Sequence, residues 1–139
     1  MIVVNPLAVL VSAVVFMAAG MLWYSPLLFG KAWAKMSGFD MSNKAQMEKM
    51  KKEAGPAYFA SFVGALVLTY VLGMFMKYTG ANTLAGGALI AFWAWLGFIA
   101  TTSLSAVLYS KKPMKLWMID AGYHLVTLLI AGMIMATWQ

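Results

Sequence analysis

Two ionisable side chains stand in an otherwise apolar segment near the end of the chain. Residues 116–138 contain one acid, Asp120, and the only histidine of the sequence, His124. Side chains four residues apart lie on one face of an α-helix, so a helix here places the carboxylate and the imidazole on the same side. Ionisable groups inside a membrane point to proton or ion pathways, and this pair therefore predicts a proton or cation relay.

A structural role explains the same two residues. In a helix that begins at Leu116, Asp120 lies only about 6 Å from the start and His124 about 12 Å. Asp120 could then cap the first turn or pair with Lys115, and His124 could donate a hydrogen bond to a hydroxyl of the neighbouring helix. The sequence leaves the relay and the structural interpretation open.

Hydroxyl groups of two other segments are expected at the depth of Asp120. The preceding apolar segment runs in the opposite direction, so its end lies beside the start of the last one. We predict a polar site made of Asp120, His124, Ser105, Thr101, Thr102 and Tyr24. An acid, a histidine and a hydroxyl are also the groups of a nucleophilic triad, but their spacing does not define that geometry. Enzymatic activity stays open and is not our expectation.

Metal and cofactor sites have little support in the sequence. The chain has one histidine and no cysteine, whereas zinc sites use three or four protein ligands. No glycine-rich phosphate loop and no nucleophile elbow occur. The 13 methionines suit Cu(I) by chemistry but also fill irregular apolar gaps. We expect no metal and no cofactor.

The composition explains where these residues must lie. Hydrophobic residues make up 63% of the chain and charged residues 10%, against about 25% charged residues in soluble domains. An apolar run of about 20 residues spans a bilayer. The first apolar run lacks the flanking features of a cleaved signal peptide, so we expect it to remain in the mature protein. We predict an all-α integral membrane four-helix bundle, a single domain over 1–139, with helices at about 6–25, 57–77, 85–109 and 116–138.

The lysines predict the orientation. All of them except Lys77 lie between the first and second or the third and fourth predicted helices. Cytoplasmic loops carry the excess of lysine and arginine, so we expect a protein of the cell membrane with both termini on the extracytoplasmic side. Anionic lipid at the cytoplasmic surface accounts for the net charge of +6. The expected partners are the lipid bilayer and further copies of the chain, with no nucleic acid.

The end of the first helix predicts an interfacial elbow. Tryptophan and tyrosine rings settle at the membrane–water interface, and a proline restricts the residue before it to extended geometry. Apolar rings then stay in the interface while a lysine extends its ammonium group into water. The elbow consists of Trp23, Tyr24, Pro26, Phe29, Lys31 and Trp33.

A short amphipathic helix on the membrane surface is expected within the rest of residues 26–55. Ser42 is a plausible N-cap, Gly55 a plausible C-terminal residue, and Pro56 the start of the next helix. A partner-binding or regulatory segment is the alternative.

Small residues predict how the helices pack. They recur at every fourth position of the second helix, and helix three has small residues at Gly87, Ala91 and Gly97. Such faces let helix backbones approach closely in lipid, either within one chain or between subunits. The packing stripe of helix two consists of Ala57, Ser61, Ala65, Thr69 and Gly73. Because four helices enclose little space, a pathway through the membrane would need a homo-oligomer.

The elbow and the start of the last helix also resemble a known family. The shared features are Gly20, residues 23–26 and 29–31, Trp33, and the stretch AGYHLV at 121–126. They resemble the small membrane-protein family called domain of unknown function 1761, over nearly the whole chain. This resemblance implies four membrane helices with an elbow after the first, and it brings no activity, cofactor or catalytic residue.

Two functions follow as alternatives. One is a homo-oligomeric transporter or channel for an ion or small polar solute, with Asp120 and His124 as its polar centre. The other is a structural or accessory membrane protein that binds partner helices through its small-residue faces, without transport or catalysis.

Overall fold

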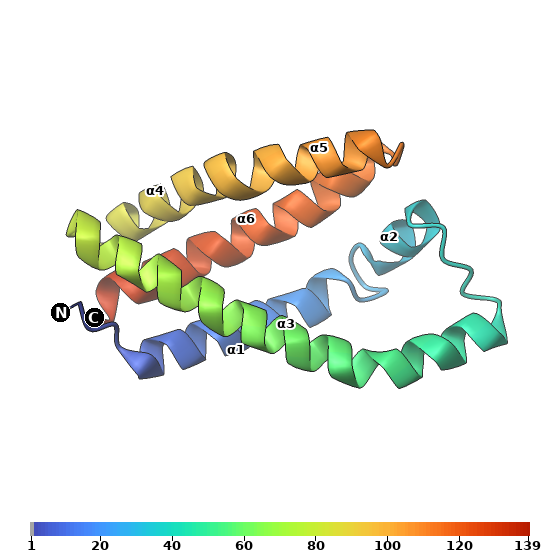
Figure 1. The fold of residues 1–139 in the computed structure, drawn as a ribbon, viewed down its shortest axis with the longest axis horizontal. Coiled ribbons are helices and arrows are strands. Elements are labelled where there is room, and N and C mark those ends of the chain that lie inside the picture. Colours follow the sequence, from blue (N-terminus) through green and yellow to red (C-terminus); the bar gives the residue numbers. More distant parts are fainter. Residues whose placement is uncertain (1) are drawn as a thin grey trace.

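The computed structural model describes residues 2–139, and this part of the chain is helical, with no strand (Figure 1). Three stretches form one continuous helical rod: α4, the π-helix η1 and α5. The elements in chain order are α1 (Pro6–Trp23), α2 (Gly30–Met36), α3 (Lys44–Thr79), α4 (Leu84–Ala94), η1 (Trp95–Ala100), α5 (Thr101–Tyr109) and α6 (Met114–Thr137).

Four helical segments of the described chain are long and apolar enough to cross a membrane: α1, α3, the rod Leu84–Tyr109, and α6. The prediction of an all-helical protein with four long apolar helices is confirmed. The chain is accordingly a multi-pass membrane protein. Figure 1 shows both termini at one end of the molecule, and the elbow with the turn between α5 and α6 at the other.

The prediction of a separate surface helix was wrong. Residues 44–79 form a single helix of 36 residues, and Pro56 lies inside it. Extending an existing helix is easier than nucleating a new one, so the helix continues through Gly55 and Pro56 despite the hydrogen bond that proline removes. The N-cap is Asn43, whose side chain accepts from the backbone of Ala45 and Gln46, and not Ser42.

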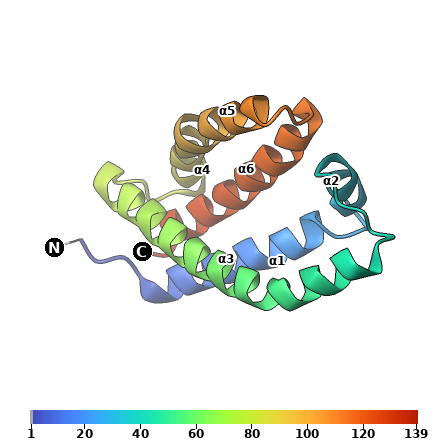
Figure 2. The ribbon, with the colours of Figure 1, turned by 45° about the vertical axis from the view of Figure 1, so that its right-hand side comes forward.

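Helix α6 lies at the centre of the arrangement. It packs against α1, α3 and α4, and its contact with α4 is the most extensive between any two helices. Figure 2 shows α6 between the α4–α5 rod on one side and α1 with α3 on the other. Towards the elbow, α3 diverges from α1, so that its first turns project beyond the other helices (Figures 1 and 2).

Two glycines explain the close contact between α4 and α6. A Cβ atom added to Gly87 would lie 2.3 Å from the carbonyl oxygen of Gly132, and one added to Gly132 would lie 2.6 Å from the carbonyl oxygen of Gly87. The helix backbones therefore touch, as small residues permit in lipid. Gly87 belonged to the predicted small-residue row, whereas the sequence analysis missed Gly132.

The predicted packing stripe of α3 divides into two halves. Its C-terminal half is buried: Ala65, Thr69 and Gly73 face the other helices, and the Thr69 hydroxyl lies 3.3 Å from the carbonyl oxygen of Val9 on α1. Its N-terminal half, Ala57 and Ser61, is exposed, because α3 has diverged from α1 there. Gly97 is also exposed, with open space around its Cα.

Gly87→Ala should destabilise the protein by about 1 to 3 kcal/mol, because the new methyl group forces the α4 and α6 backbones apart. Gly64→Ala is the matched control, since a Cβ at Gly64 meets nothing within 4 Å. The free energy of unfolding is measured by titration with sodium dodecyl sulfate in mixed micelles. Equal effects of the two substitutions would contradict the packing described above.

Candidate functional site

Three hydrogen bonds from aromatic side chains join the C-terminal half of α1 and the start of the elbow to α6. Trp23 Nε1 donates to the Ile119 carbonyl at 3.1 Å, and the Tyr24 hydroxyl donates to Asp120 Oδ1 at 2.7 Å. In the reverse direction, the Tyr123 hydroxyl donates to the Phe16 carbonyl at 3.0 Å. Buried tryptophan and tyrosine side chains need partners for their polar ends, and within a membrane those partners must come from the protein.

The elbow fixes the position of Tyr24. After α1 the chain turns back, and the backbone N–H of Phe29 donates to the Trp23 carbonyl at 3.0 Å. A Cβ atom on Gly30 would lie 2.3 Å from the Tyr24 carbonyl oxygen, so this turn requires glycine. The rings of Trp33 and Tyr24 meet edge to face with centroids 5.8 Å apart. The elbow thereby holds the Tyr24 hydroxyl against α6.

The outer surface of the elbow is exposed, and it carries apolar side chains beside a lysine. Pro26 and Lys31 are exposed, and Leu27 is 85% exposed. The two lysine-bearing turns also touch, since Lys112 Nζ donates to the Ser37 carbonyl at 3.3 Å. The predicted elbow residues therefore divide into rings that position Tyr24 and an outer face.

Asp120 is half-buried inside α6, and the Tyr24 hydroxyl is its hydrogen-bond donor. It does not cap the helix, which begins at Met114. It is not paired with Lys115 either: among residues 2–139, the ion pair within 4.0 Å joins Lys49 to Glu53. Burial and the hydrogen bond to Asp120 raise the pKa of Tyr24, which follows the last residue of α1, so this hydroxyl stays a donor.

His124 shares the face of Asp120 but contacts its backbone. The Nδ1 atom lies 2.9 Å from the Asp120 carbonyl oxygen. A carbonyl only accepts, so this contact requires a proton on Nδ1 and leaves the lone pair of the neutral ring on Nε2. The ring packs edge to face on Tyr123, with centroids 4.9 Å apart. The imidazole and the Asp120 carboxylate thus lie on one helix face without a direct bond between them.

The predicted hydroxyls of the third span lie elsewhere. Thr101, Thr102 and Ser105 are exposed, and each donates to a carbonyl of its own helical rod, at 2.9, 2.6 and 3.4 Å. The π-helix η1 precedes them, and its extra residue turns the following side chains by about 100° from the face that a regular helix gives. The predicted site therefore comes together only in part, at Tyr24, Asp120 and His124.

Ser103, which the sequence places at the same depth as the predicted hydroxyls, is the one that contacts α6. Trp117 Nε1 lies 3.0 Å from Ser103 Oγ and 3.2 Å from the Ala100 carbonyl oxygen. Trp95 Nε1 similarly donates to the Ala121 carbonyl at 2.8 Å. The signal available in the sequence was the need of each tryptophan for an acceptor.

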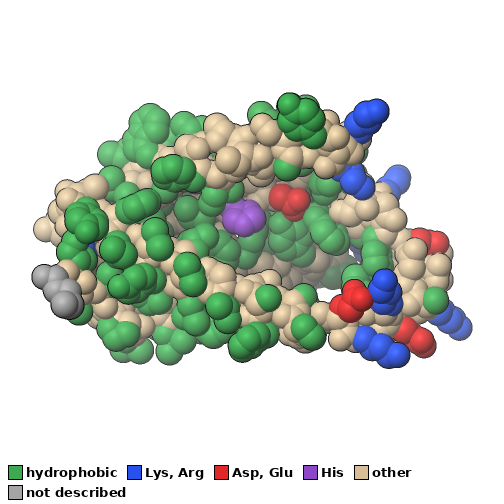
Figure 3. Space-filling view, in the orientation of Figure 1, with side chains coloured by type: hydrophobic (Ala, Val, Ile, Leu, Met, Phe, Trp, Pro, Cys, Tyr) green, Lys and Arg blue, Asp and Glu red, His purple; other side chains and the backbone are tan. Residues whose placement is uncertain are grey.

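The polar face of α6 is open on one side of the molecule. Figure 3 shows the histidine, in purple, and an acidic side chain in a hollow framed by apolar side chains, with most lysines gathered at one end. Among residues 2–139, no group of three or more histidine, aspartate or glutamate side chains could hold a metal ion.

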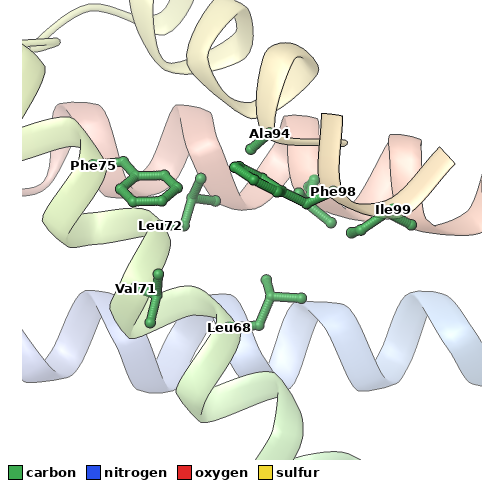
Figure 4. Close-up of a pocket in the computed structure, with 8 residues that line it drawn as sticks. Leu68, Val71, Leu72, Phe75, Ala94, Phe98 and Ile99 are labelled. Carbon is green, nitrogen blue, oxygen red and sulfur yellow. The ribbon is translucent and has the colours of Figure 1, made fainter. Parts of the chain in front are cut away.

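A separate pocket of about 410 Å³ lies between α3 and the rod of α4 and η1 (Figure 4). Only hydrocarbon side chains line it, so it offers no partner to a polar solute and suits a lipid chain. Its walls are Leu68, Val71, Leu72, Phe75, Ala94, Phe98, Ile99 and Leu128.

Tyr24→Phe should lower the free energy of unfolding by about 1 to 3 kcal/mol, because it leaves the half-buried Asp120 carboxylate without its donor. Tyr78→Phe is the control, since Tyr78 is 70% exposed. Unfolding is followed by tryptophan fluorescence in detergent. A Tyr24→Phe protein as stable as the control would show that this hydrogen bond does not hold the elbow to α6.

Comparison with known proteins identifies the family to which the chain belongs. No curated protein and no solved structure matches the chain. The family model described as "Protein of unknown function (DUF1761)" matches residues 7–136, which include the elbow and the polar face of α6. The resemblance seen in the sequence is confirmed, and the chain belongs to this family.

Proposed function

We propose that this protein is a homo-oligomeric transporter or channel of the cell membrane for an ion or small polar solute, with Asp120 and His124 at its polar centre. One observation carries the proposal: Asp120 lies inside a membrane-spanning helix, half-buried, with a tyrosine hydroxyl and no cation beside it in the described chain. An acid at this depth is costly, and such residues mark ion and substrate pathways.

The geometry gives each residue a distinct role. The Tyr24 hydroxyl holds one carboxylate oxygen of Asp120, so the other is available to a cation or a polar solute. His124 is oriented by its bond to the Asp120 carbonyl and can take a proton at Nε2. Protonation of the His124 ring places a positive charge one helical turn from the carboxylate. This charge lowers the affinity of Asp120 for a cation. Proton uptake and cation release are thereby coupled.

Further copies of the chain complete the pathway in this proposal. A single chain leaves the polar face of α6 open (Figure 3) and Gly97 of the helical rod exposed, with nothing within 4 Å of an added Cβ. Small residues permit close helix contacts, so a second copy can cover this face and close the hollow. The lysine-bearing end faces the cytoplasm, and both termini lie on the extracytoplasmic side.

An accessory function without transport is the second candidate. The exposed hydroxyls of Thr101 and Thr102 are already bonded within their own helical rod, and a Cβ at Gly97 meets nothing within 4 Å. This face offers close approach to a partner helix and no free polar group to a solute.

Flux into liposomes separates the two functions. The purified protein should carry protons or Rb⁺, followed with an internal pH-sensitive dye and by isotope uptake. Asp120→Asn and His124→Ala should each reduce that flux by roughly tenfold or more, because each removes an ionisable group of the pathway. Asp40→Asn, at an exposed loop position, is the matched control.

Flux equal to that of empty liposomes would favour the accessory function. Flux that survives in both the Asp120 and His124 variants would remove these residues from the pathway.

A further inference from the structure

A second cavity, of about 270 Å³, opens beside the Tyr24–Asp120 pair. It lies where α3 diverges from α1, so its walls come from α1, α3 and α6. Three tyrosine side chains line it, one at the end of α1, one on α3 and one on α6: Tyr24, Tyr58 and Tyr123. Its volume is close to the lower limit of about 300 Å³ for ligand pockets, which limits it to a small ligand.

The packing of the helices keeps these rings in place. The rings of Tyr24 and Tyr123 meet at 63° with centroids 5.3 Å apart, and both hydroxyls are bonded to a neighbouring helix. A Cβ atom on Gly20 would lie 2.9 Å from the Tyr123 hydroxyl oxygen. Glycine at this position therefore lets the Tyr123 ring approach α1, and two walls of the cavity are fixed before any ligand binds.

The electrostatics of the cavity favour a positive charge. No lysine lines it, and Asp120 lies directly behind Tyr24. A tyrosine whose hydroxyl donates a hydrogen bond to a carboxylate gains electron density in its ring, and the negative face of an aromatic ring attracts cations. The remaining wall includes Met17 and Met21, whose polarizable thioethers adapt to an apolar surface.

We propose that this cavity binds a small organic cation of the quaternary ammonium class, whose methyl groups pack against the rings of Tyr24, Tyr58 and Tyr123. Aromatic cages recognise quaternary ammonium groups in this way, because such a cation is only weakly hydrated and has no hydrogen-bond donor to satisfy. The inference rests on the proposed function in one respect, since it names a substrate class for the site that contains Asp120.

The charge of the ligand is the feature to test first. Choline and its uncharged analogue 3,3-dimethyl-1-butanol have the same shape, so their difference reports the cation alone. The full chain in maltoside micelles, free of choline lipids, is titrated with each compound by isothermal titration calorimetry. Choline should bind about tenfold or more tightly than the alcohol. Equal affinities, or no binding of choline, would overturn the proposal.

Two tyrosine variants of α3 test whether the ring of Tyr58 contributes to binding. Tyr58→Leu should weaken choline binding by about five- to tenfold, because it removes one cation–π contact. Tyr70→Leu is the matched control, since both tyrosines are exposed on α3 and Tyr70 does not line the cavity. Tyr58 is 56% exposed, so its loss should leave folding intact. An equal effect of the two variants would contradict the cage.

The ammonium group can come from a free solute or from a lipid headgroup. Repeating the titration in nanodiscs of phosphatidylcholine, and in nanodiscs of phosphatidylglycerol with phosphatidylethanolamine, distinguishes these sources. Choline binding that is lost only in phosphatidylcholine shows that the headgroup occupies the cage. Choline binding that is equal in both shows that the cage takes a free solute.

Binding and flux separate this inference from the proposed function. Choline binding without any flux in liposomes would sustain the cage and overturn transport. Flux of protons or Rb⁺ by a protein that does not bind choline would sustain transport and overturn the cage.

Discussion

The rest of the structure depends on one constraint: a polar hydrogen inside a membrane must find its acceptor within the protein. Five tryptophan and tyrosine side chains meet this requirement with hydrogen bonds between α6 and a neighbouring segment: Trp23, Tyr24, Trp95, Trp117 and Tyr123. Trp23 and Trp95 donate to backbone carbonyls of α6 two residues apart, at Ile119 and Ala121, and Tyr24 donates to Asp120 between them. These bonds tie the elbow and the α4–α5 rod to the same turn of α6, and they place the one acid of this helix at the point where the elbow closes.

Much of the fold follows from composition and periodicity, since long uncharged runs define the spans and the aromatic cluster defines the elbow. The continuity of α3 could not be predicted, because Gly55 and Pro56 are stop signals whose local cost is outweighed by helix propagation. The site could be predicted only in part. Asp120 and His124 share a face through their spacing alone, whereas the position of the third-span hydroxyls depends on the π-helix η1, for which the sequence carries no plain signal.

The two cavities between the helices differ in the polarity of their walls. The pocket between α3 and the α4–η1 rod is lined by hydrocarbon, which suits it to lipid. The cavity near the elbow is lined by three tyrosines, two methionines and Ser61, and Asp120 of α6 is bonded to one of those tyrosines, Tyr24. Its lining residues lie on α1, α3 and α6, at the end of the molecule where α1 meets the elbow. In the proposed function, polar solutes reach this cavity from the lysine-bearing end, and the apolar sides of the four spans face lipid.

Accessibility of single cysteines to a charged thiol reagent tests this account most directly, because the chain has no native cysteine. Ser61 lines the cavity near the elbow, and Leu68, two turns further along α3, lines the hydrocarbon pocket. In sealed vesicles, a cysteine at Ser61 should react rapidly with a membrane-impermeant methanethiosulfonate reagent applied at the lysine-bearing side, and a cysteine at Leu68 should stay unreactive. Equal reactivity at the two positions, or reaction of Ser61→Cys only from the opposite side, would contradict it.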